Sequence, residues 1–92
     1  MLQRVAMVKL LTRPGCEACN RGKFILRRLR LHVPFEAKVV NIMKHTDYAK
    51  YSNDLPVILV EEEPICRGKI SERDLRKAIS EFNNAQTRKA DE

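Results

Sequence analysis

The segment TRPGCEAC, residues 12–19, holds two of the three cysteines and lies between two contrasting stretches of sequence. Before it, residues 5–11 are rich in Val, Leu and Met, which predicts a mostly buried strand. Pro14 and Gly15 end that strand. After it, apolar residues recur at helical spacing over about residues 16–32, and Arg and Lys occupy the other face. The cysteines therefore lie where a buried strand gives way to a basic amphipathic helix.

A cysteine in the first turn of a helix faces unpaired backbone N–H groups and the positive end of the helix dipole, which stabilise a thiolate. We expect Cys16 to hold this more exposed position and Cys19 to lie one turn further in. Lys9 and Arg13 before the cysteines, and Arg21 and Lys23 after them, are expected to add to the positive field. Because two residues separate the cysteines, a disulfide can form between them and reopen. Cys16 is thus the candidate attacking thiol and Cys19 the candidate resolving thiol.

Other interpretations of these residues compete with redox chemistry. Cysteines at this spacing also form half of a zinc site, but Cys66, His32 and His45 provide no second pair at ligand spacing. Redox chemistry is therefore favoured, and no metal site is predicted. Glu17 either opposes a thiolate at Cys16 or, as we favour, complements the helix dipole. Cys66 is expected to be a small buried apolar residue rather than a third redox thiol.

The rest of the chain predicts a single α/β domain at residues 1–84, followed by a polar tail at 85–92. We expect a strand at 35–42, a short helix or turn at 44–53, strands at 57–60 and 64–69, and a final helix capped by Ser71. The element order is β-α-β-α-β-β-α. The first two strands, joined through a helix, should be parallel, and the last two, joined by a short charged turn, should be antiparallel.

Composition and charge limit the classes of function. The 92 residues are 43% hydrophobic and 33% charged, with a net charge of +6. No stretch approaches about 18 apolar residues, so no membrane span is predicted. The first 44 residues hold ten Lys or Arg and two acidic residues, which favours anionic partners, whereas the few aromatic residues among them disfavour nucleic acid. An odd number of cysteines does not suit a secreted disulfide framework, so we expect the cytoplasm, with an organelle as the alternative.

Residues 12–19 and a second motif, DLPVILV at residues 54–60, together resemble the thioredoxin superfamily, most closely its glutaredoxin-like branch. The resemblance covers about residues 5–82 and implies a thioredoxin fold, in which helices flank a central mixed sheet of four strands. It also implies that Pro56 is cis and faces the cysteine pair. Leu55 would then offer backbone groups to an extended peptide or to glutathione, and Arg13 would hold a glutathione carboxylate.

The sequence departs from the glutaredoxin pattern in two places. Glu17 and Ala18 stand between the cysteines, where dithiol glutaredoxins commonly carry Pro and an aromatic residue. Residues 66–69, CRGK, replace the Gly-Gly and Asp with which glutaredoxins grip glutathione. The sequence therefore matches the usual glutathione site on the side of Arg13 and does not match it on the other side.

These observations predict a thiol–disulfide oxidoreductase that uses the Cys16–Cys19 dithiol. Its substrates would be disulfide-containing proteins or glutathione mixed disulfides, with glutathione as a candidate co-substrate and no bound cofactor. We expect a monomer. Two alternatives remain: a non-catalytic binding module that uses the basic helix face, and a metal or iron–sulfur carrier.

Overall fold

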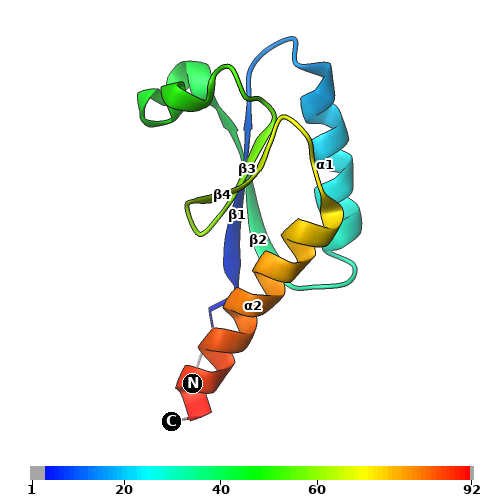
Figure 1. The fold of residues 1–92 in the computed structure, drawn as a ribbon, viewed down its shortest axis with the longest axis vertical. Coiled ribbons are helices and arrows are strands. Elements are labelled where there is room, and N and C mark those ends of the chain that lie inside the picture. The colour runs from blue at the N-terminus through cyan, green and yellow to red at the C-terminus, as the bar shows by residue number, and fades with distance from the viewer. Residues whose placement is uncertain (1–3, 92) are drawn as a thin grey trace.

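The computed structural model describes residues 4–91, and the side chains of residues 4–85. The elements follow the predicted order, with two short 3-10 helices in the place of the second helix (Figure 1). In chain order they are β1 (Ala6–Thr12), α1 (Glu17–Leu29), β2 (Phe35–Asn41), η1 (Ile42–Lys44), η2 (Thr46–Tyr51), β3 (Val57–Val60), β4 (Glu63–Arg67) and α2 (Glu72–Asp91).

The four strands form one mixed sheet in the order β2-β1-β3-β4. β1 is parallel to β2, as the crossover through α1 requires, and antiparallel to β3. β3 and β4 form the antiparallel hairpin expected from a short charged turn. The predicted α/β class and mixed four-stranded sheet are therefore confirmed.

The two long helices cover the same face of the sheet (Figure 1). The core on that side joins Val8 and Leu10 of β1 to Leu29 of α1 and to Leu75 and Ile79 of α2. All five side chains are fully buried. This packing fixes α1 against the sheet and so fixes where α1 begins, at the end of β1.

The opposite face of the sheet carries a second, smaller cluster. Leu11 of β1 and Val57 of β3 pack there with Ile42 of η1 and Tyr51 of η2. The two 3-10 helices therefore cover the end of this face that lies near the start of α1, and apolar packing orders both sides of that end.

The C-terminal ends of α1 and α2 differ from the predicted ones. α1 ends at Leu29, and tighter turns carry the chain on to residue 33. α2 begins as predicted, with the Asp74 N–H donating to the Ser71 hydroxyl at 3.2 Å. We expected α2 to fray from Asn83, but it continues to Asp91.

Asn83 anchors α2 at the position where we expected it to fray. Its side chain accepts a hydrogen bond from the Ala6 N–H at 3.0 Å and donates one to the Pro34 carbonyl at 2.9 Å. These bonds tie α2 to the start of β1 and to the residue before β2, a link between distant segments that a local sequence pattern does not reveal.

The division into a domain at 1–84 and a tail at 85–92 stays a prediction. None of the described helices is long and apolar enough to cross a membrane.

Candidate active site

A tight turn brings the chain from β1 into α1. The Cys16 N–H donates to the Arg13 carbonyl at 3.2 Å, and Gly15 lies in the left-handed region with a φ of 83°. Pro14 and Gly15 occupy the two central positions, which is the residue pattern of a type II turn. The turn leaves Cys16 as the N-cap residue of α1, with extended backbone at φ −87° and ψ 99°.

The two cysteines form a disulfide in which they differ in accessibility. Their Cα atoms are 5.4 Å apart. Cys16 is half-buried, whereas Cys19, inside the first turn of α1, is only 2% exposed. The Cys19 Sγ lies 4.0 Å from the Leu11 carbonyl oxygen, to which its thiol can donate once the disulfide is reduced. The structure thus places Cys16 toward solvent and Cys19 behind it, the arrangement predicted for an attacking and a resolving thiol.

A hollow of about 430 Å³ opens beside Cys16. Arg13 lines it, together with Asn20 and Lys23 on the same face of α1 as Cys16. Asn41 reaches it from the end of β2, because the parallel register pairs Asn41 with Thr12 at the end of β1. Arg13, which we predicted to belong to the site, therefore lies beside the thiol pair.

Sequence reasoning did not single out Asn20 or Asn41 as lining residues. The helical spacing of four from Cys16 to Asn20 was the available signal for the first. Asn41 depends on the pairing of two strands and had no local signal.

A second hollow, of about 220 Å³, lies on the other side of the cysteine motif. Ala18, between the two cysteines, and Arg21 line it from α1, and Lys69 lines it from the loop between β4 and α2. Pro56 forms part of the same wall, and the Leu55–Pro56 peptide bond is cis. The expected cis bond is therefore present, and Pro56 shares this hollow with Ala18 of the motif; its facing the cysteine pair stays a prediction.

Leu55 lies just outside the strand ladder, which begins at Val57 in β3. Its side chain packs against the smaller apolar cluster. The Pro56 carbonyl accepts a hydrogen bond from the Gly68 N–H at 2.8 Å, which holds the loop before α2 against this segment. The role predicted for Leu55 in holding substrate backbone stays a prediction.

Gly22 lets α1 approach that same loop closely. A Cβ built at Gly22 would lie 3.0 Å from the Ile70 side chain and 3.1 Å from the Leu10 side chain. A residue larger than glycine would crowd these side chains, which would have to give by a few tenths of an ångström, and Ile70 is one of the residues that line the second hollow.

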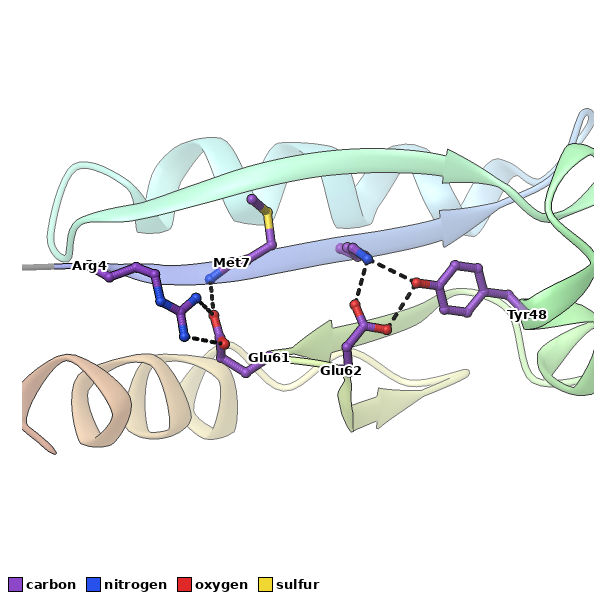
Figure 2. A network of polar contacts seen from close by, with 6 residues as sticks. Arg4, Met7, Tyr48, Glu61 and Glu62 are labelled. Carbon is purple, nitrogen blue, oxygen red and sulfur yellow. Dashed lines mark hydrogen bonds and ion pairs between the residues drawn. The ribbon is translucent and has the colours of Figure 1, made fainter. Parts of the chain in front are cut away.

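Lys9 does not contribute to the site as expected. Its ammonium group contacts Glu62 and the Tyr48 hydroxyl. Glu62 and Tyr48 lie on the sheet face away from α1 (Figure 2). The hydrogen bond to Glu62, and then the one to Tyr48, raises the pKa of Lys9 above its usual value. Because Glu62 neutralises this charge, Lys9 adds little to the field around Cys16.

Cys66 is buried, as predicted, with 4% of its surface exposed. Its Sγ accepts a hydrogen bond from the Ser71 N–H at 3.4 Å, and burial raises the pKa of its thiol. His32 and His45 are exposed. Among the described residues, no group of three or more His, Cys, Asp or Glu side chains gathers where a metal ion could bind.

The model of a known protein family, the glutaredoxin-like domain (DUF836), matches residues 7–80. A search of curated proteins finds no match. Among solved structures, the chain is similar to protein Ne2328 from Nitrosomonas europaea, with a TM-score of 0.73 and 21% identity over 86% of this chain and 96% of that one.

Two thioredoxins also share the architecture. A mutant thioredoxin from Halobacterium salinarum NRC-1 aligns with a TM-score of 0.63 and 13% identity, over 87% of this chain and 76% of that one. Thioredoxin 1 from Thermosipho africanus TCF52B aligns with a TM-score of 0.61 and 13% identity, over 88% and 98%. These similarities show that the fold is the thioredoxin fold. Since the family model spans most of the chain, the protein belongs to the glutaredoxin-like domain (DUF836) family.

Proposed function

We propose that this protein is a thiol–disulfide oxidoreductase in which Cys16 is the nucleophile and Cys19 the resolving thiol. The observation that carries the proposal is the disulfide between a half-buried cysteine at the N-terminus of α1 and a fully buried one behind it. A thiolate at Cys16 gains from the helix dipole and from the unpaired N–H groups of the first turn. The buried thiol is held close enough to compete for the mixed disulfide.

The reaction begins with both cysteines reduced. The Cys16 thiolate attacks one sulfur of a substrate disulfide, a Cys16–substrate bond forms, and the other substrate sulfur leaves as a thiolate that takes up a proton. Cys19 then loses its proton and attacks the Cys16 sulfur, which releases the second substrate thiol and closes the Cys16–Cys19 disulfide. Two electrons pass from the dithiol to the substrate.

Arg13, Leu55 and Pro56 are the proposed substrate-binding residues. Arg13 lines the hollow beside Cys16 and is suited to a carboxylate. Leu55 precedes Pro56 outside the β3 ladder, where it can pair with an extended chain. Disulfide-containing proteins and glutathione mixed disulfides are the proposed substrates. We further propose that the protein acts as a monomer in the cytoplasm, with glutathione as a co-substrate and no bound cofactor.

The test measures, on one preparation, reduction of insulin and, separately, of a glutathione mixed disulfide. Cys16→Ser should abolish both activities. Cys19→Ser should instead trap a Cys16–substrate adduct that mass spectrometry detects. Cys66→Ser serves as the matched control, since a buried thiol away from the disulfide should not be required.

Inactivity in both assays, with Cys16 alkylated no faster than free cysteine, would contradict the proposal. That result would favour a binding module. Iron or zinc bound to the freshly isolated, anaerobic protein would favour a carrier of metal or of an iron–sulfur cluster.

A further inference from the structure

We propose that the preferred substrate is a protein disulfide with acidic residues next to its cysteines. This inference rests on the oxidoreductase function proposed above and names its substrate class. It follows from the distribution of paired and unpaired charges over the described side chains.

None of the residues in the described ion pairs lines either of the two hollows at the cysteine motif. Four are present among the side chains of residues 4–85: Arg4–Glu61, Lys9–Glu62, Arg28–Glu72 and Arg67–Asp54. Two of them lie at the hairpin turn between β3 and β4, one joins α1 to α2, and one lies at the end of β4. Acidic residues are thus used to neutralise cations at these places.

The cations that line the two hollows have no such partners. Arg13 and Lys23 line the hollow beside Cys16, and Arg21 and Lys69 line the hollow beside Pro56. All four side chains are exposed, and none forms an ion pair within the part of the chain whose side chains are described. A substrate that brings carboxylates to both sides of the disulfide would find four unpaired positive charges.

The second hollow is the more selective of the two. Glu17 lines the hollow beside Cys16 and reduces its positive charge, whereas none of the acidic residues with described side chains lines the hollow beside Pro56. The apolar side chains of Pro56 and Ile70 lie in its wall with Arg21 and Lys69. This combination suits a peptide segment with an apolar residue and a carboxylate, and it disfavours a cationic group at the same place.

The chemistry is the exchange described above, with the reduced dithiol of this protein as the electron donor and the acidic protein disulfide as the acceptor. Cys16 forms the mixed disulfide, Cys19 displaces it, and two substrate thiols are released. A small dithiol such as dithiothreitol supplies the electrons that reduce the protein again in the assay. Charge complementarity raises the rate of encounter and leaves these bond changes unaltered.

The experiment uses three disulfide-bonded peptides that differ only in the residues flanking the cysteines, which are Glu, Gln or Lys. The reduced protein is mixed with each peptide, samples are quenched by alkylation, and mass spectrometry gives the second-order rate constant. We expect the Glu peptide to react at least about tenfold faster than the Lys peptide at low salt. The ratio should fall toward one at about 0.5 M salt, because salt screens exposed charges.

Charge reversal assigns the effect to the second hollow. Arg21→Glu with Lys69→Glu should remove or invert the preference for the Glu peptide. Arg76→Glu with Lys77→Glu makes the same change of charge on the exposed face of α2, where the two residues line a different hollow, and should retain most of the preference. All four substitutions are at exposed positions, and circular dichroism before the assay checks that both variants fold.

The outcomes separate this inference from the function on which it rests. Equal rates for the three peptides, or a preference for Lys, would overturn the inference and leave the oxidoreductase function intact. If a neutral peptide that carries a glutathione mixed disulfide reacted faster than the Glu peptide, that result would also overturn the inference and leave the oxidoreductase function intact. Reduction of no peptide at all would overturn both.

Discussion

Two turns at opposite ends of β1 use left-handed backbone, and they achieve it in different ways. The turn before α1 does so with Gly15, at a φ of 83°, a conformation that glycine adopts freely. The turn between β3 and β4 does so with Glu61 and Glu62, at φ of 51° and 68°. A residue with a Cβ costs about 1–2 kcal/mol in this conformation, so the second turn needs compensation that the first does not.

Polar contacts hold Glu61 in its strained conformation (Figure 2). Its carboxylate accepts two hydrogen bonds from the Arg4 guanidinium, at 3.0 and 2.9 Å, and one from the Met7 N–H at 2.8 Å. Its own N–H donates to the Met7 carbonyl at 2.9 Å. Glu61 therefore closes the β3–β4 turn onto the start of β1.

Glu62 makes a separate set of contacts, with Lys9 and with the Tyr48 hydroxyl, which donates to it at 2.9 Å. The comparison shows that the left-handed backbone conformation is stabilised differently in the two turns. Acidic side chains at the hairpin turn offset strain by binding cations. Glycine at the turn before α1 needs no such partners, and Arg13 beside it forms no ion pair within the part of the chain whose side chains are described.

The largest effect on stability is expected from Glu61→Ala. It removes the Arg4 contacts and the acceptor of the Met7 N–H but keeps the left-handed strain, so the free energy of unfolding should fall by about 2 kcal/mol. Urea denaturation at neutral pH measures this change. Glu61→Gln is the matched variant: it retains one acceptor oxygen and should lose about half as much.

The effect of Glu61→Ala should depend on pH. Burial raises the pKa of Glu61, but the hydrogen bonds from Arg4 and from the Met7 N–H outweigh it, so the net pKa lies below its usual value of 4.5. A carboxylate with a lowered pKa in the folded state contributes its full stabilisation above about pH 4.5 and loses it as the pH falls through the lower folded value. The difference between wild type and variant should therefore narrow in acid. A difference independent of pH would show that the charge of Glu61 does not matter.

Gly15→Ala should lower the free energy of unfolding by about 1–2 kcal/mol. A Cβ at Gly15 meets nothing within 4 Å, so the cost is entirely conformational. Because the turn sets the position of Cys16, the variant should also alkylate Cys16 more slowly in the reduced protein. Gly68→Ala is the matched control: its φ is 76° and a Cβ there makes only an ordinary contact, 3.6 Å from the Asp54 carbonyl. Slower alkylation in both variants would mean that lost stability, and not the turn before Cys16, is responsible.

Lys9→Gln should lower the free energy of unfolding by about 0.5–1 kcal/mol, because it breaks a half-exposed ion pair. Its second expected result is negative: the rate of Cys16 alkylation should not change, since Glu62 already neutralises Lys9. Arg13→Gln, which alters an unpaired cation beside the thiols, should slow alkylation. If Lys9→Gln slowed the alkylation of Cys16 more than Arg13→Gln did, Lys9 and not Arg13 would be the cation that acts on Cys16.

Much of the fold could be predicted from local sequence patterns. Four features could each be predicted from a few neighbouring residues, and each is present in the structure: the buried run of β1, the helical spacing of α1, the Ser71 cap of α2 and the charged turn. The position of Cys16 at the start of α1 followed from the same patterns, because Pro14 and Gly15 mark a turn in any sequence.

What local patterns missed depends on contacts between distant segments. Glu61 and Glu62 carry no sign of left-handed backbone, since Gly or Asn is the usual signal at such turns. The partner of Lys9 lies 53 positions further along the chain, so no local pattern indicated that Glu62 would neutralise the charge that we expected to act on Cys16. Lys69 and Arg21 share a hollow only because the loop before α2 packs against α1.

Glu62→Gly is expected to have the smallest effect and separates strain from ion pairing. It removes the contacts with Lys9 and Tyr48, which costs about 1 kcal/mol, but it also relieves a left-handed residue with a Cβ, which returns a similar amount. The free energy of unfolding should therefore change by less than about 0.5 kcal/mol, whereas Glu62→Ala, which loses the contacts and keeps the strain, should lose about 1 kcal/mol. Parallel urea denaturation of both variants measures the difference. If Glu62→Gly were as destabilising as Glu62→Ala, the hairpin turn would carry no strain for its ion pairs to offset, and the contrast with Gly15 would fail.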